Sequence, residues 1–335
     1  MKTLLALLTL LIISTAFAQL SYKGEIEVAS DLSLASSNKM LTETFGLSFR
    51  GHLELDYALD PIDFRLVLDP TVRLAGNAEN ALLEPGLTEA FALYRVGDID
   101  LSAGLERLPL ETARLSVPFR VESVNEVGQA LGLLGARASI FLDDWRVRPA
   151  LLYRTQDDKL AGVVSVRREF SSFDLEAHVV YLDRFAAGLE GSGLIGDIVL
   201  YGEAWLLSEP WDGRGAVGLS GYWGDLLWTG ELAYAADPLD SDLNLDESTL
   251  NDVANPYPQL LGQFSLPRGD TGTVELNVSL GLKDSVLRDS GAFQAIGNLR
   301  YTHTESDYQF MVGPTFNHTE LATVYGVRLG VTAFF

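Results

Sequence analysis

The chain has 335 residues, of which 47% are hydrophobic and 21% charged, and it contains no cysteine. It is acidic, with 24 Lys and Arg residues against 46 Asp and Glu residues and a formal net charge of −22. The lack of cysteine excludes disulfides, thiolate metal sites, cysteine nucleophiles and a lipoprotein anchor. The acidic balance argues against nucleic-acid partners, which bind basic surfaces.

The first residues have the order of a secretory signal peptide. Lys2 supplies a positive charge, residues 4–13 are apolar, and Ala16-Phe17-Ala18 forms a small-x-small cleavage site. We therefore predict a signal peptide over residues 1–18 and a single mature domain over residues 19–335. The alternative is a core helix of a cytoplasmic protein. Loss of Lys2 leaves 24 − 1 = 23 basic residues against 46 acidic ones, a mature charge of −23.

After Gln19, apolar and polar residues alternate with a period of two. Phe49, Leu53 and Leu55 fall on one face of a strand, and Glu54 and Asp56 fall on the other. Such segments run to about ten residues, the length of a tilted membrane strand. Since only helices and closed barrels span a bilayer, the pattern predicts an all-β fold, a transmembrane antiparallel up-and-down β-barrel. The alternatives are a soluble sandwich, a solenoid or a water-soluble barrel.

The connections between these segments alternate in length. Tight turns are predicted at Asp60-Pro61, Gly97-Asp98, Asp143-Asp144, Ser171-Ser172, Gly224-Asp225 and Glu305-Ser306. Longer links are predicted at residues 36–43, 75–86, 108–129, 208–214, 238–256 and 284–290. With the N-terminus in the periplasm, every tight turn falls on the periplasmic side, as in bacterial barrels. The count is 18 strands, with 16 as the alternative, because residues 87–96 and 185–192 alternate poorly.

The last strand supports the same class. Tyr325, Val327, Leu329 and Val331 share a face with the aromatic Phe335. This segment resembles the terminal targeting strand of bacterial outer-membrane proteins, which the barrel-insertion machinery reads. The resemblance implies that Phe335 is an insertion signal, that outer-membrane lipid surrounds the barrel, and that the chain resides in the bacterial outer membrane.

Residues 108–129 form the longest link with charges of both signs, and they also contain apolar side chains that an inward fold would bury. The link resembles the loop that folds inward and narrows the pore of general porins, a family that implies a homotrimer. Residues 87–107 resemble a strand pair of porin-like proteins, although Leu110-Glu111 stand where a Trp-Gly pair often follows. The candidate constriction residues are Glu111, Arg114, Arg120, Glu122 and Glu126.

Barrels of 16 to 18 strands enclose water, so the polar strand faces are expected to line a pore. The candidate pore-lining residues are Arg65, Arg73, Arg146, Arg148, Arg154, Glu54, Asp56, Asp174, Glu176 and Glu275. One hypothesis is a transverse field of basic and acidic walls that orients solutes. The other, which we favour for most of these charges, is pairing across neighbouring strands that holds the wall together.

The large aromatic residues could be core residues, but most are interpreted as interfacial anchors, with a stacked aromatic track for sugars as the alternative; they are Trp205, Trp223, Trp228, Tyr181, Tyr201, Tyr301, Tyr308 and Phe316. No serine has a nucleophile-elbow pattern, and His178 merely shares a face with Glu176. The sequence thus predicts no enzyme, no catalytic residues, no cofactor and no metal site. The acidic link at residues 237–247 lacks the glycine and closing glutamate of a calcium loop, although divalent ions bridging it to anionic lipid remain an alternative.

The leading functional hypothesis is a porin, a water-filled channel for passive diffusion of small hydrophilic solutes or ions. The acid excess predicts a mild cation preference. The alternatives are a solute-selective channel of similar build and a non-transporting barrel that tethers the envelope or binds a partner.

Overall fold

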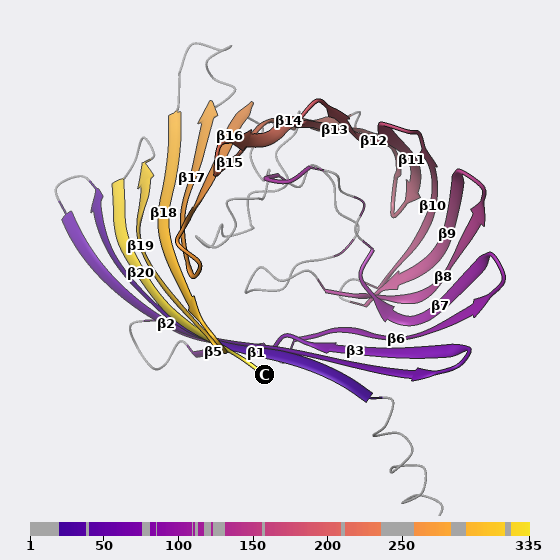
Figure 1. Ribbon diagram of the computed structural model, residues 1–335, viewed down its shortest axis with the longest axis horizontal. Coiled ribbons are helices and arrows are strands. Elements are labelled where there is room, and N and C mark those ends of the chain that lie inside the picture. The colour runs from indigo at the N-terminus through magenta and orange to yellow at the C-terminus, as the bar shows by residue number, and fades with distance from the viewer. Residues whose placement is uncertain are drawn as a thin grey trace, which may run out of the picture.

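The computed structural model describes residues 20–37, 40–75, 81–84, 86–108, 110, 113–116, 122, 131–155, 158–208, 212–235, 258–282, 293–318 and 323–335. These residues form one antiparallel sheet of β-strands (Figure 1). The strands are β1 (Leu20–Ser37), β2 (Met40–Leu59), β3 (Ile62–Leu68), β4 (Thr71–Ala75), β5 (Ala81–Glu84), β6 (Leu87–Val96), β7 (Ile99–Glu106), β8 (Leu133–Leu142), β9 (Trp145–Arg154), β10 (Lys159–Glu169), β11 (Phe173–Tyr181), β12 (Phe185–Ile195), β13 (Ile198–Leu207), β14 (Asp212–Trp223), β15 (Leu226–Ala235), β16 (Gln259–Arg268), β17 (Gly272–Leu282), β18 (Phe293–Glu305), β19 (Tyr308–His318) and β20 (Thr323–Phe334). The predicted signal peptide lies outside the described residues.

The sheet closes on itself, because β1 pairs with β2 on one side and with β20 on the other. The last residue completes the seam: the N–H of Phe335 donates to the Gly24 oxygen and the N–H of Gly24 donates to the Phe335 oxygen, both at 2.9 Å. A closed sheet leaves no edge with unpaired backbone groups, as a lipid environment requires.

Twenty strand segments make 18 strands of the wall, as predicted, and the alternative of 16 is wrong. β3 and β4 both pair with β2 and lie end to end as one strand, and β6 and β5 pair with them as the next. The interruption falls at Pro70, which has no N–H to give to the ladder. Backbone bonds from Gly51 to Pro70 and from Asp69 to Gly86 continue the pairing across it.

Tight turns join β2–β3, β6–β7, β8–β9, β10–β11, β12–β13, β14–β15, β16–β17 and β18–β19, so all of them lie at one end of the barrel. This arrangement confirms the end at which the predicted tight turns lie and adds the turns at residues 196–197 and 269–271, although residues 182–184 join β11 and β12 just as tightly at the opposite end. The last turn lies at residues 306–307, one residue later than predicted. Gly97, Asp143, Gly196, Gly224 and Ser306 have positive φ, the conformation that tight hairpins need to match the strand twist.

Several predicted links are shorter than the alternation indicated. Strand pairing continues to Ser37 opposite Met40, so residues 36–43 are mostly strand. Ala81–Glu84 forms β5 within the predicted link at 75–86, and β14 already begins at Asp212. Local alternation missed these ends because pairing to a neighbour, which the sequence does not display, extends a strand into polar residues. The predicted links at 238–256 and 284–290 lie outside the described residues.

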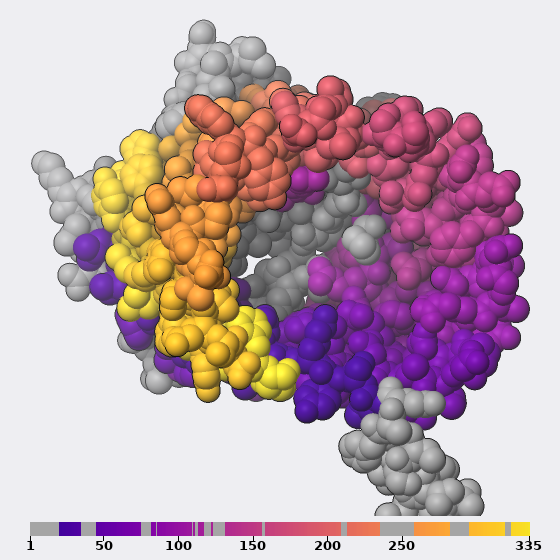
Figure 2. Space-filling view, in the orientation of Figure 1, coloured from indigo at the N-terminus to yellow at the C-terminus, as the bar shows by residue number. Residues whose placement is uncertain are grey.

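The outer surface of the wall is apolar. On β11, Phe173, Leu175, Val179 and Tyr181 are exposed, whereas the alternate side chains are buried or half-buried. β12 and β13 repeat this alternation, and exposed apolar side chains lie on most other strands. They form a broad apolar surface that is unfavourable in water and favourable in lipid. Figure 2 shows the wall as a ring of side chains around a hollow. Among the described residues, no helix has the length and apolar character to cross a membrane.

Candidate pore and its inner segment

The connection between β7 and β8, residues 107–132, enters the hollow of the barrel, and we call it the inner segment. Its described residues are 107, 108, 110, 113–116, 122, 131 and 132. Figure 1 shows the described, coloured part of the inner segment inside the ring of strands, beside β13 and β14. Since β7 and β8 lie elsewhere in the wall, the segment reaches across the interior rather than standing over its own strands.

Glu231 on β15 holds the inner segment to the wall. Its Oε2 accepts the N–H of Arg114 at 2.9 Å and that of Leu115 at 3.1 Å, while its Oε1 accepts the Ser116 hydroxyl. The Tyr201 hydroxyl donates to Oε2 at 3.0 Å. Glu231 is 1% exposed, so its charge depends on these four donors, and hydrogen bonds to an ionised acceptor are the strong ones.

Two further contacts fix the same stretch. Glu203 on β13 accepts the N–H of Ala113 at 2.9 Å. The guanidinium of Arg114 lies 5.0 Å from the centre of the Tyr201 ring, a cation–π contact. The backbone of residues 113–115 is therefore bound to β13 and β15 through carboxylates that approach from the wall.

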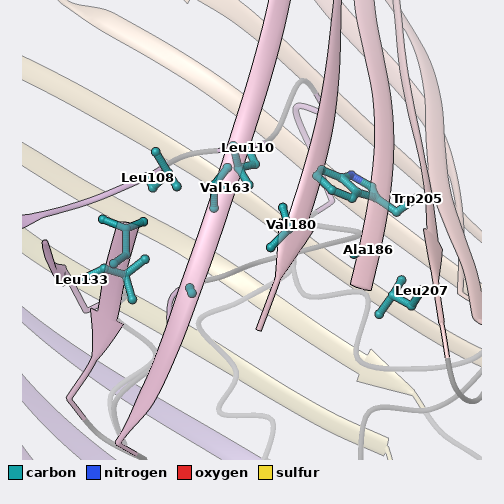
Figure 3. Close-up of a cluster of buried hydrophobic side chains, with 10 residues drawn as sticks. Leu108, Leu110, Leu133, Val163, Val180, Ala186, Trp205 and Leu207 are labelled. Carbon is teal, nitrogen blue, oxygen red and sulfur yellow. The ribbon is translucent and has the colours of Figure 1, made fainter. Parts of the chain in front are cut away.

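Apolar packing supports these polar contacts in two places. Leu115 packs with the inward side chains of Ala216, Ala233 and Leu261 on β14–β16. Leu108 and Leu110 pack with inward residues of β8–β13, as Figure 3 shows. That second cluster contains Leu133, Leu152, Ala161, Val163, Val180, Ala186, Trp205 and Leu207. The small alanines in the wall leave the space that the leucines of the inner segment fill.

The predicted constriction residues have different places. Arg114 lies in the anchored stretch, and Glu122 is buried and accepts the N–H of Leu108 at 2.6 Å, which ties two parts of the inner segment together. Glu111, Arg120 and Glu126 lie outside the described residues.

The predicted pore-lining residues on the first strands form one ion-pair network on the face opposite the apolar surface. The Glu54 carboxylate contacts Lys23 at 2.6 Å, His52 at 3.0 Å and Arg65 at 3.3 Å. Arg65 also reaches Asp56 at 3.7 Å and Glu89 at 3.1 Å. These pairs join β1, β2, β3 and β6 across the wall.

A second network joins β9–β11, and a separate ion pair joins β7 and β8. Glu176 pairs with Arg148 and lies 3.8 Å from Arg146, while Asp174 contacts Arg167 at 2.8 Å. On the neighbouring strands, Arg137 and the buried Glu106 are 3.0 Å apart. Arg154 ends β9 on the same face as Arg146 and Arg148.

The remaining predicted residues, Glu275 and Arg73, lie on β17 and β4. Glu275 on β17 pairs with Arg300 on β18. Arg73 on β4 lies within electrostatic range of Arg50, Arg328 and Asp31. Both networks and the Glu275–Arg300 pair agree with the hypothesis of pairing across neighbouring strands. A pore-lining role for these residues remains a prediction.

The interpretation of most large aromatic residues as interfacial anchors does not hold for Tyr201 and Trp205. Both side chains point inward and are buried, at 2% and 3% exposure, whereas Tyr181 and Trp223 are exposed on the wall. The alternation along β13 could have indicated this, because Tyr201 and Trp205 fall on the same face of the strand as the polar Glu203. What covers them is the inner segment, whose path no local pattern indicates.

The closed 18-stranded barrel with an apolar outer surface and an inward segment is the fold of bacterial outer-membrane porins. Among solved structures of Pseudomonas aeruginosa proteins, OccK7 (OpdD) has a TM-score of 0.64 at 10% identity, with 94% of this chain and 99% of that one covered. OpdQ has a TM-score of 0.62 at 9% identity (94% and 99% covered). The outer membrane protein OpdK has a TM-score of 0.61 at 11% identity (94% and 98% covered). No known family profile and no curated protein matches the sequence.

Proposed function

We propose that this protein is a porin of the bacterial outer membrane, a water-filled channel that the inner segment narrows. The observation that carries the proposal is the Glu231 contact, which holds residues 114–116 against the inner wall of a hollow barrel. A loop held against the wall in this way narrows the lumen of a water-filled barrel. Small hydrophilic solutes or ions would pass beside the anchored segment, and no catalytic step is part of the proposal.

We propose a mild cation preference for the channel. The mature chain carries 23 basic and 46 acidic residues, and a low-dielectric wall concentrates the counterions of its net charge. The arginine-rich face of β9 limits the preference. The pairing of Arg148 with Glu176 in turn weakens the attraction of this face for anions.

A solute-selective channel is the second candidate. The structure of OpdK solved with vanillate, an aromatic carboxylate, has a TM-score of 0.59 to this chain at 11% identity. In this chain, Arg146, Arg148 and Arg154 line one face of a single strand, where guanidinium groups could exchange an internal carboxylate partner for that of a solute. We expect outer-membrane lipid to surround the barrel and the barrel-insertion machinery to assemble it. The proposed assembly is a homotrimer.

Single-channel recording of the purified protein in planar bilayers tests these proposals. A steady ohmic conductance without block supports the general porin. Concentration-dependent block by one class of solute, such as aromatic carboxylates, supports the selective channel. Folded protein that inserts but gives no conductance would overturn both and favour an envelope-tethering barrel.

A further inference from the structure

Three glutamates form a row on the inner wall of β11, β12 and β13. Glu176 lies opposite Glu190, and Glu190 lies opposite Glu203 in the strand register. Their exposed fractions are 3%, 9% and 4%. Like charges directly opposite each other on neighbouring strands destabilise a sheet, and a buried carboxylate needs a compensating partner. The row therefore calls for positive charge close to its middle member, Glu190.

His178 completes the cluster. It lies two residues after Glu176 on β11, and its side chain is fully buried. Its ring stacks on Trp205 with centroids 5.3 Å apart, and its Nδ1 lies 2.8 Å from the Ser165 hydroxyl. When Nδ1–H donates to Ser165, the lone pair of Nε2 points to Glu190, and a hydrogen bond of this kind orients histidines that bind metals.

The spacing of His178 and Glu190 fits a metal ion better than a direct ion pair. Nε2 lies 3.4 Å from Glu190 Oε1, whereas a charge-assisted hydrogen bond is about 2.7–2.9 Å long. Neither Nε2 nor Glu190 Oε2 has a hydrogen-bond partner among the described residues. Two ligands at about 2.0–2.1 Å from one tetrahedral ion are about 3.3 Å apart. The ligand atoms of Glu176, His178 and Glu190 lie within 4.8 Å of one another.

We propose that Glu176, His178 and Glu190 bind one divalent transition-metal ion, with Zn²⁺ as the best match. Imidazole with carboxylates is a zinc donor set, whereas calcium and magnesium prefer oxygen ligands alone. Arg148 also pairs with Glu176, so His178 and Glu190 are the main ligands and Glu176 shares its carboxylate. The negative charge of Glu203, which lies opposite Glu190 in the strand register, adds to the electrostatic attraction of the site for the metal ion.

The site lies beside an attachment point of the inner segment. Glu203, the end of the glutamate row, accepts the N–H of Ala113. A cation at Glu190 relieves the repulsion between Glu190 and Glu203, so Glu203 can stay ionised while it holds Ala113. The ion is thus expected to stabilise the folded barrel, since it binds only the folded state.

The test is metal retention by the full-length protein, folded in detergent, stripped with a chelator, incubated with Zn²⁺ and passed through gel filtration. The wild type is expected to retain one Zn²⁺ per chain by elemental mass spectrometry. His178→Gln and Glu190→Gln are expected to retain none. The matched control is His52→Gln, which removes an inward histidine bound to Asp69 and Glu54 on another part of the wall and should keep the full equivalent.

Heat-modifiable migration on gels confirms that each variant is folded. Full retention by both His178→Gln and Glu190→Gln would overturn the proposal, as would a wild type that retains no Zn²⁺. If the variants do not fold, the zinc X-ray absorption spectrum of the wild type decides. Imidazole scattering supports the site, and a spectrum with oxygen ligands alone rejects it.

Discussion

Glu231 and Leu115 are 116 positions apart in the chain, yet Glu231 Oε2 accepts the backbone N–H of Leu115 at 3.1 Å inside the barrel. The bond lies at the centre of four donors that converge on one buried carboxylate. Three of these donors belong to the inner segment, so Glu231 is its main polar attachment to the wall, beside the Glu203 contact and the apolar packing.

Glu231→Gln should loosen the inner segment. The amide replaces one acceptor oxygen with a donor group and removes the charge, a loss of about 1.5–3 kcal/mol for a hydrogen bond to an ionised group. We expect a folded barrel with larger and more frequent fluctuations of open-channel current. Glu275→Gln is the control, because Glu275 pairs with Arg300 and contacts no described residue of the inner segment. Equal current noise in both variants would reject the anchoring role of Glu231.

The two ends of β9 should lie on opposite sides of the membrane. Asp144 precedes β9 in a tight turn, and Thr155 follows it, and both residues are exposed. On intact cells, Thr155→Cys should react with a membrane-impermeant maleimide and Asp144→Cys should not, with lysed cells as the control for reactivity. Labelling of Asp144→Cys alone would invert the proposed orientation.

The channel should prefer cations moderately, and salt should weaken the preference. The Debye length falls from about 10 Å at 0.1 M salt to about 3 Å at 1 M. Reversal potentials across a salt gradient should therefore indicate stronger cation preference at low than at high ionic strength. Anion preference at low salt would mean that ion pairs such as Arg148–Glu176 neutralise the acidic side chains, and that the remaining arginines set the sign of the charge along the pore.

Deletion of Phe335 should slow assembly of the barrel. Its two backbone hydrogen bonds to Gly24 close the seam between β20 and β1, and the terminal aromatic residue is the proposed insertion signal. Pulse-chase labelling should show unfolded chain accumulating in the periplasm and less heat-modifiable barrel. Phe334→Ala, which retains Phe335, serves as the control. A normal rate of assembly for the deletion would remove Phe335 from its proposed role.

The wall could be predicted from the sequence, because alternation is a local property of each strand. Residues such as Phe173, Glu176 and Val179 display their faces directly, and counting the alternating segments predicted 18 strands. The interruption at Pro70 and the short β5 were missed, since pairing rather than pattern defines them.

The interior could be predicted only in part. Inward folding of residues 108–129 followed from apolar residues such as Leu115, but its attachment to Glu231 depends on strands more than a hundred residues away. The neighbours of His178 were hidden for the same reason. Glu176 shares its strand and was visible, whereas Glu190 and Trp205 come from β12 and β13 and meet it only through register.

The most direct test of a channel narrowed by its inner segment is the single-channel conductance of a barrel in which residues 110–126 are replaced by a short glycine-serine linker. The account predicts a folded, heat-modifiable barrel with a steady conductance clearly above that of the wild type. The same conductance in both proteins would mean that the inner segment does not limit the pore, and would contradict the account.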